Sequence, residues 1–122
     1  MSNQATPYDE LARVFHEPKR LAIVSALCAT TDGLSFSELK KEGDFTDGNL
    51  SRHLKTLEDD GVVYLHKAFV GVKPRTTVFL SDTGRERFLA YLKALESVLS
   101  RAAEAVELHE DAVDTDGHTA RA

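Results

Sequence analysis

The chain has 122 residues and a formal net charge of −5, with 15 lysines and arginines against 20 acidic residues. This length allows one domain with its own core and excludes a second. No segment reaches the ~18 apolar residues of a membrane span, and the N-terminus lacks the apolar core of a signal peptide. We therefore expect a single-domain protein that stays in the cytoplasm and has no membrane partner.

The negative charge is concentrated near the C-terminus. From residue 104 onward there are six acidic side chains and one arginine, which together carry −5, so residues 1–103 are neutral. A neutral body can still bind DNA, because affinity depends on the cations that face phosphate and not on the overall sum. We expect residues 1–7 to be a flexible N-terminus and residues 110–122 to be an acidic disordered tail.

The segment YDELARVFHEPKRLAIVSALCAT is predicted to form two helices, divided at Pro18, because proline fits the first turn of a helix. In the second helix three residues are predicted to share an inward stripe: Leu21, Val24 and Cys28. In the first helix three apolar residues fit either the core or a dimer contact, and the sequence does not separate these roles: Leu11, Val14 and Phe15.

Two further helices are predicted between residues 35 and 61, joined by a short turn. Ser35 and Glu38 have the spacing of a capping box, and Gly43 is predicted to end that helix. Thr46 can cap the next helix, which Gly61 then ends. The leucines of this second helix have the spacing of a single buried stripe: Leu50, Leu54 and Leu57.

The opposite face of that helix carries side chains suited to a DNA groove. Arginine pairs with guanine, asparagine with adenine, serine with either base edge, and lysine with guanine or phosphate. The face and its flanks comprise Gly48, Asn49, Ser51, Arg52, Lys55, Thr56 and Asp59. A solvated face that binds nothing is the alternative. Because the acidic residues 58–60 would repel phosphate, we expect the N-terminal half of the helix to dock.

A β-hairpin is predicted next, with arms VVYLHKAFV and TTVFLS joined by GVKPR, and its tip is predicted at residues 71–76. Lys73 and Arg75 flank Pro74, which would stiffen the turn and hold two cations toward the DNA backbone or a minor groove. A plain surface turn is the alternative. A cationic hairpin beside a helix that fits the major groove is the geometry of a winged-helix DNA binder.

A long helix is predicted from Ser81 or Asp82 to about His109. Its apolar residues are spaced 4, 3, 4, 3 and 4 apart, which is a heptad seam: Phe88, Leu92, Leu95, Leu99, Ala102 and Val106. A stripe that extends beyond a small core usually packs against another chain, so we expect a symmetric dimer. Packing onto its own domain is the alternative.

Few groups in the sequence suit metal or redox chemistry. Cys28 is the only cysteine, so no intramolecular disulfide forms, and its apolar neighbours favour a buried small side chain over a redox-sensing thiol. No CxC or CxxC motif is present. The remaining metal-ligating side chains lie at a helix end and in the tail: Glu107, His109, Asp114 and His118. We expect no metal and no cofactor, and the lack of catalytic motifs argues against an enzyme.

Three segments together resemble the bacterial and archaeal winged-helix transcriptional regulators related to MarR and ArsR: HEPKRLAIVSAL, LSFSELKKEGDFTDGNLSRHLKTLEDDGVV and FVGVKPRTTVFLSDTGRERF. The resemblance implies a dimeric DNA-binding repressor or activator. It also suggests an effector pocket near Phe88 and Tyr91, although aromatic residues there more often pack in a core or dimer contact. The positions that match the family's DNA-contacting residues are Asn49, Ser51, Arg52 and His53 in the helix and Lys73 and Arg75 in the wing.

His53 has two interpretations. Its helical angle lies about 60° from the centre of the leucine stripe, which places it at the boundary of the buried face. The resemblance instead makes it a DNA-contacting residue. Both interpretations stay open from the sequence.

We predict an α+β fold, mainly α with a small β-hairpin: a winged helix-turn-helix domain at residues 8–81, followed by a dimerisation helix at residues 82–109. The predicted function is a homodimeric transcriptional regulator, a repressor by default, that binds double-stranded DNA at a pseudo-palindromic operator. A winged-helix protein-interaction module without sequence-specific DNA binding is the alternative. The predicted DNA-binding residues are Thr46, Asn49, Ser51, Arg52, His53, Lys55, Lys73 and Arg75.

Overall fold

The computed structural model describes residues 7–115, with side chains described for residues 8–110. The chain divides into two compact units, residues 1–91 and residues 92–122. Residues 1–6 of the predicted flexible N-terminus lie outside the described residues. The same holds for the predicted tail beyond Thr115, which includes His118.

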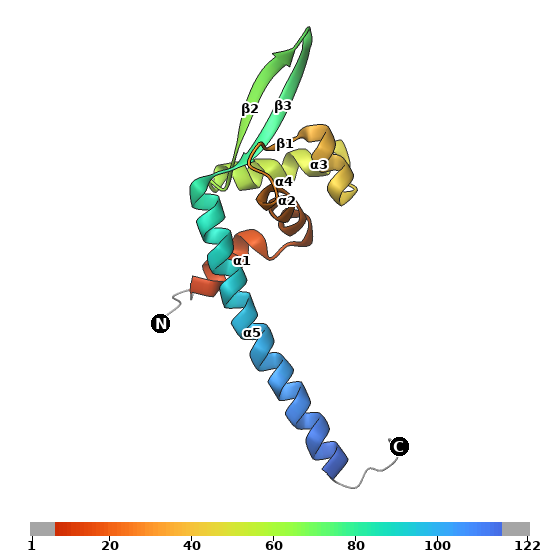
Figure 1. Cartoon of the computed structure of the whole chain (residues 1–122), viewed down its shortest axis with the longest axis vertical. Helices are drawn as coiled ribbons and strands as arrows, with labels where there is room; N and C mark the ends of the chain where they lie inside the picture. The colour runs from red at the N-terminus through yellow and green to blue at the C-terminus, as the bar shows by residue number, and fades with distance from the viewer. Residues whose placement is uncertain (1–6, 116–122) are drawn as a thin grey trace. The chain divides into compact units, whose positions relative to one another are not determined.

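The described part of the chain contains five helices and three strands (Figure 1). The helices are α1 (Pro7–Phe15), α2 (Pro18–Cys28), α3 (Phe36–Gly43), α4 (Asp47–Asp59) and α5 (Asp82–Thr115). The strands are β1 (Leu34–Ser35), β2 (Val63–Val70) and β3 (Lys73–Leu80). This order confirms the predicted α+β winged helix with a long C-terminal helix. That helix ends at Thr115, beyond the end predicted near His109.

The strands form one antiparallel sheet in the order β1-β3-β2. Strands β2 and β3 pair along their full length, from Val63 opposite Leu80 to Val70 opposite Lys73, and Figure 1 shows this ribbon projecting beyond α2, α3 and α4. Strand β1 pairs only Leu34 and Ser35 with the base of β3. It was not predicted, because two residues carry no alternation of apolar and polar side chains.

The predicted helix caps are present. Ser35 Oγ accepts a hydrogen bond from the Glu38 amide at 3.1 Å, and the Glu38 carboxylate accepts one from the Ser35 amide at 2.8 Å, which completes the capping box. Helix α3 ends at Gly43, as predicted. The residue that adopts the left-handed conformation at this helix end is the following one, Asp44, with φ 55°. Asparagine and aspartate are the non-glycine residues that adopt this conformation most readily.

The core of residues 8–91 forms around the leucines of α4. Its buried apolar residues are Val14, Phe15, Ile23, Val24, Leu27, Leu39, Phe45, Leu50, Leu54, Leu57, Val62, Val63, Val78, Phe88 and Tyr91. The predicted stripe on α2 is wrong for Leu21 and Cys28, which are only partly buried. Helix α2 is apolar on nearly every side, so periodicity alone did not identify the face that packs on α3 and α4.

An aromatic cluster connects α1 with the start of α5. The Phe15 ring lies 5.3 Å from that of Phe88 and 5.5 Å from that of Tyr91, and the Tyr91 hydroxyl is 2.8 Å from His16 Nδ1. Val14 and Phe15 therefore belong to the core, whereas Leu11 is partly exposed. The assignment of Phe88 to a dimer interface is wrong, because its own chain leaves it only 4% exposed. Neither Phe88 nor Tyr91 is free to contact an effector.

Beyond Tyr91, α5 keeps large apolar side chains in solvent. The exposed ones are Leu92, Val98, Leu99, Val106 and Leu108, while Leu95 is partly exposed. Four positions of the predicted heptad seam, Leu92, Leu99, Ala102 and Val106, are thus exposed in the single chain.

Gly84 in the first turn of α5 offers a test of the packing at the base of the hairpin. A Cβ at this position would collide with the backbone of Val62. We expect Gly84→Ala to lower the free energy of unfolding by about 1–3 kcal/mol, as overpacked cores do. The matched control is Gly48→Ala on the open surface of α4, which should raise it by up to ~1 kcal/mol through helix propensity. Chemical denaturation of both variants measures the difference, and equal stabilities would contradict the close approach.

Candidate nucleic-acid interface

Helix α4 presents a polar face whose orientation is set by its buried leucines. Ser51, Arg52 and Lys55 are exposed, and Asn49 is partly exposed. Thr46 is the N-cap: its hydroxyl accepts a hydrogen bond from the Asn49 amide at 3.1 Å. The first turns of α4 therefore combine amide donors and the positive end of the helix dipole with side chains that can read base edges.

The groups on this face are already engaged with neighbours on α4. Arg52 Nη2 donates to Asn49 Oδ1 at 3.0 Å, and Lys55 Nζ lies 3.1 Å from the Asp59 carboxylate. That hydrogen bond to Asp59 raises the pKa of Lys55. Because both pairs are exposed, they exchange readily with water, and a DNA base or phosphate can replace the partner.

The hairpin turn differs from the predicted one. It contains only Gly71 and Val72, so the prediction that Lys73, Pro74 and Arg75 form the turn is wrong, since all three begin β3. Gly71 adopts φ +67°, which lets a two-residue loop close the hairpin. Pro74 is tolerated because β1 does not reach it, so one edge of β3 is free there.

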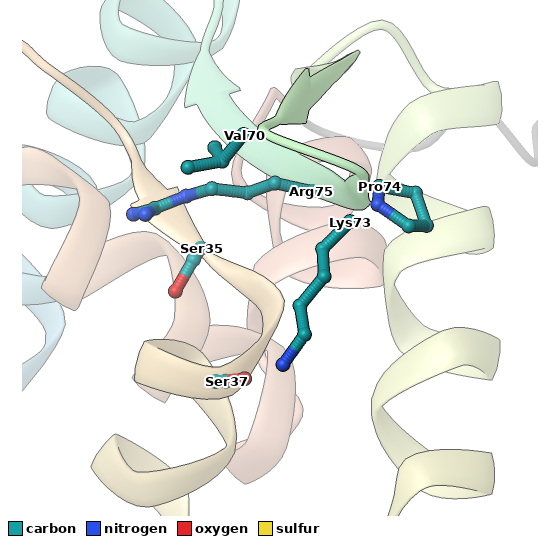
Figure 2. A pocket seen from close by; sticks show the side chains of 6 residues that line it. All are labelled: Ser35, Ser37, Val70, Lys73, Pro74 and Arg75. Atoms are coloured by element: carbon teal, nitrogen blue, oxygen red, sulfur yellow. The ribbon is translucent and has the colours of Figure 1, made fainter.

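Since side chains alternate along a strand, Lys73 and Arg75 point to the same face of the hairpin. They line a cleft of about 320 Å³ with Ser35 and Ser37 from the start of α3. Figure 2 shows the Lys73 side chain extending toward Ser37, while the Arg75 side chain passes Ser35. The Arg75 guanidinium lies 3.9 Å from Glu38, so the capping box holds one of the two cations.

The hairpin carries a further cation that the motifs in the sequence did not single out. Lys67 on β2 is exposed and points to the face opposite Lys73 and Arg75. Its signal in the sequence is composition, because residues 61–81 contain no aspartate or glutamate. Every formal charge on the hairpin is therefore positive.

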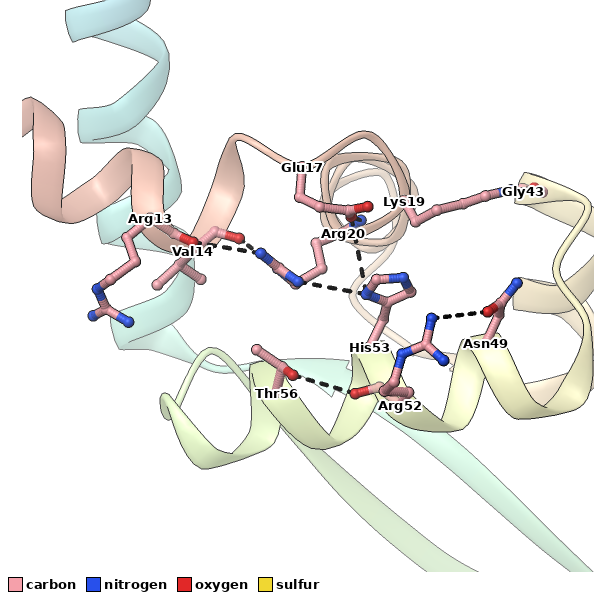
Figure 3. A network of polar contacts seen from close by, with 10 residues as sticks. All are labelled: Arg13, Val14, Glu17, Lys19, Arg20, Gly43, Asn49, Arg52, His53 and Thr56. Carbon is pink, nitrogen blue, oxygen red and sulfur yellow. Dashed lines mark hydrogen bonds and ion pairs between the residues drawn. The ribbon is translucent and has the colours of Figure 1, made fainter.

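His53 is buried, with 8% of its surface exposed, which supports the boundary interpretation and removes it from the groove-facing set. Figure 3 shows its ring facing the start of α2. Arg20 Nη1 lies 3.5 Å from His53 Nδ1 and Arg20 Nε donates to the Val14 carbonyl at 2.7 Å, while Glu17 lies 3.9 Å from the same ring nitrogen. Since a guanidinium only donates, Nδ1 of the neutral ring accepts and Nε2 carries the proton.

Among residues 8–110, no group of three or more histidine, cysteine, aspartate or glutamate side chains is arranged to hold a metal ion. No helix in the described part of the chain is long and apolar enough to cross a membrane. Cys28 is partly buried, and this burial raises the pKa of its thiol.

Comparison with known proteins places the fold in a family. The winged helix DNA-binding domain family matches residues 19–99, and the chain belongs to this family. A transcriptional regulator homologue from Pyrococcus horikoshii OT3 is 31% identical, with a TM-score of 0.71 over 79% of this chain and 96% of the other. The predicted resemblance to winged-helix transcriptional regulators is thereby confirmed.

Two less similar structures share the fold. A MarR-family transcriptional regulator from Enterococcus faecalis V583 has a TM-score of 0.70 at 18% identity, over 88% of this chain and 96% of the other. MepR of S. aureus, solved as a complex with DNA, has a TM-score of 0.60 at 18% identity, over 86% of this chain and 88% of the other.

The environment of His53 predicts a pH dependence of stability. Burial lowers the pKa of His53, and the nearby cations Arg20, Arg52 and Lys19 lower it further, while Glu17 opposes them. Since the unfolded chain then binds the proton more tightly, stability falls as the pH drops below about 6.5 toward the pKa of the folded state.

We expect His53→Asn to lose less stability than wild type between pH 7 and pH 5, because the amide oxygen replaces Nδ1 as an acceptor without titrating. Urea denaturation across this range measures how the free energy of unfolding changes with pH. His66 is an exposed histidine on β2, and His66→Asn is the control for removing a histidine. If His53→Asn showed the same pH dependence of stability as wild type, His53 would not be its source.

Proposed function

We propose that this protein is a transcriptional regulator that binds double-stranded DNA sequence-specifically through α4 and the hairpin β2–β3. The observation that carries the proposal is the exposed face of α4, with Asn49, Ser51, Arg52 and Lys55, next to a hairpin whose only formal charges are positive. An α-helix fits the major groove, and a cationic hairpin beside it can contact the neighbouring backbone or minor groove. Membership of a winged helix DNA-binding family supports the same conclusion.

The charge distribution along α4 sets its direction of docking. Its N-terminal half carries Arg52, the amide ends of the first turn and one acid, Asp47, which is paired with Lys40. Three acids, residues 58–60, lie at its C-terminal end. Phosphate is attracted to the first region and repelled by the second. The N-terminal half therefore enters the groove, and the direct base contacts are assigned to Asn49, Ser51 and Arg52.

The regulator acts as a homodimer through α5. Leu99 and Val106, each 58% exposed, and the small Ala102 lie on one stripe of the helix, as in two-stranded coiled coils. A two-fold dimer places two copies of α4 on successive major-groove faces about 34–36 Å apart, which matches a pseudo-palindromic operator. Repression by blocking the polymerase is the default mode of action in this proposal, and the cytoplasm is the proposed site of action.

A second candidate function rests on the apolar side chains near the hairpin turn. Phe69 is 74% exposed, Val72 is 91% exposed, and Val70 lies between them. Exposed apolar residues grouped at one place mark contact sites for proteins as well as for DNA. This surface would serve a winged-helix module that binds another protein and does not bind DNA sequence-specifically.

Neutralising the proposed DNA-binding cations distinguishes the two functions. We expect the combined substitution of Arg52, Lys55, Lys73 and Arg75 by glutamine to weaken binding to duplex DNA. It should also flatten the plot of log K against log salt by about 0.9 for each phosphate that the variant no longer neutralises. Lys93→Gln on α5 is the single-charge control. Wild-type affinity and salt dependence in the quadruple variant would favour the protein-interaction module.

Selection of genomic DNA fragments by the purified protein at near-physiological salt tests sequence specificity. We expect sequencing of the retained fragments to give an enriched motif with two-fold symmetry, because a symmetric dimer reads the same half-site twice. Retention without a motif would indicate architectural binding. Absence of retention would count against the proposed function.

The dimer is tested by placing charges in the apolar stripe. We expect Leu99→Glu combined with Val106→Glu to give a monomer at micromolar concentration in sedimentation velocity, because two carboxylates would be buried at each contact. The matched control is Ser97→Glu combined with Ser100→Glu, which adds the same charge at exposed positions on the side of the helix away from the stripe and should remain dimeric. A monomeric wild-type protein would contradict the dimer.

A further inference from the structure

A groove lined by both apolar and polar side chains separates α4 from the hairpin. It has a volume of about 280 Å³, and Leu54 and Leu65 are among its lining residues. Ser51, Lys55 and Glu58 line it from α4, and Lys67 and Thr76 line it from β2 and β3. The proposed DNA-binding residues do not include Lys67 or Thr76.

The strand register fixes the position of these two side chains. Lys67 and Thr76 are directly opposite each other in the β2–β3 ladder, so they share one face of the hairpin. Val78, two residues after Thr76, is fully buried, so this is the face that turns toward the helices at its base. Lys73 and Arg75 point from the other face, and the hairpin is therefore cationic on both sides.

Within the described part of the chain Lys67 has no acidic partner, unlike Lys55, the other cation that lines the groove. Among the described residues, no carboxylate lies within ion-pair distance of its Nζ, whereas Lys55 is held by Asp59 and Arg75 by Glu38. Glu58 is the acidic group of the groove, and it forms no ion pair with Lys67. The groove thus combines one unpaired ammonium group with the hydroxyls of Ser51 and Thr76.

The geometry of B-DNA indicates what passes through such a groove. One sugar–phosphate strand separates a major groove from the adjacent minor groove, so a protein that places a helix in the first and a hairpin at the second has that strand between them. We propose that the α4–hairpin groove binds this strand, with the Lys67 ammonium and the Thr76 hydroxyl holding a backbone phosphate. This proposal rests on the proposed function, since it requires α4 to dock in the major groove.

The site has the properties of a positioning contact. Phosphate contacts fix the orientation of a protein on the duplex and carry no direct sequence information. Lys67 and Thr76 therefore contribute equally on cognate and unrelated sequences, in contrast to Arg52. Glu58 lies on the wall opposite and opposes the bound phosphate, so its neutralisation strengthens binding.

The test measures the affinity of the full-length protein for a duplex that carries the selected motif and for an unrelated duplex, between 50 and 200 mM salt. We expect Lys67→Gln to weaken binding to both duplexes by a similar factor. The salt slope should fall by about 0.9 per subunit bound, which makes the loss of affinity over this range about 3.5-fold smaller per subunit. Lys67→Arg should retain the wild-type slope, Thr76→Val should weaken binding, and Glu58→Gln should tighten it. Lys93→Gln is the charge control.

A scan of neutral methylphosphonate linkages along the motif then locates the bound phosphate. One linkage per half-site lies between the major groove that binds α4 and the adjacent minor groove. Neutralising this linkage should lower the affinity of the wild-type protein but should leave the affinity of Lys67→Gln unchanged. An unchanged salt slope in Lys67→Gln, or equal sensitivity of both proteins at every linkage, would overturn the phosphate site while leaving the proposed function intact. Failure of the wild-type protein to bind any duplex would overturn both.

Discussion

Burial of the leucine stripe on α4 is the constraint on which the rest of the structure depends. Leu50 and Leu57 are fully buried and Leu54 nearly so, and each such side chain contributes roughly 1.5–3 kcal/mol relative to an exposed one. This packing fixes the rotation of α4 about its axis. Asn49, Arg52 and the rest of the polar face are consequently held outward whether or not DNA is present, so little ordering of α4 is required when it binds.

The base of the hairpin is attached to the end of the same helix. Gly61 ends α4 in a Schellman motif, with the Val62 amide donating to the Leu57 carbonyl at 2.9 Å and the Gly61 amide to the Glu58 carbonyl at 2.9 Å. Ser81 Oγ donates to the Gly61 carbonyl at 2.7 Å and accepts from the Gly84 amide at 2.8 Å, so one hydroxyl connects α4, β3 and α5. The hairpin therefore starts from a fixed point beside α4, and the groove between them is a property of the folded domain.

Electrostatics in this protein are local. Residues 1–103 have no net charge, and several cations near the interface pair with acids of the same chain, as in Lys40 with Asp47 at 2.6 Å and Lys55 with Asp59. When DNA binds, phosphate must replace these acidic partners. The favourable free energy of binding is therefore smaller than the number of lysines and arginines implies. The hairpin has no acidic residue of its own, although Arg75 pairs with Glu38 of α3. In the proposed complex with DNA, the hairpin supplies the long-range attraction and α4 supplies the base-reading groups.

The sequence by itself determined the elements whose signals are local. The capping box at Ser35, Pro18 at the start of α2 and Gly61 after α4 depend on residues within a few positions, and all three were predicted. Tertiary structure decided which sides of these elements meet. It buried Phe88 against Phe15, placed His53 inside, and added β1, whose two residues have no pattern of their own. It also brought Lys67 beside α4, because a contact between distant segments depends on strand register and packing, which no short stretch of sequence records.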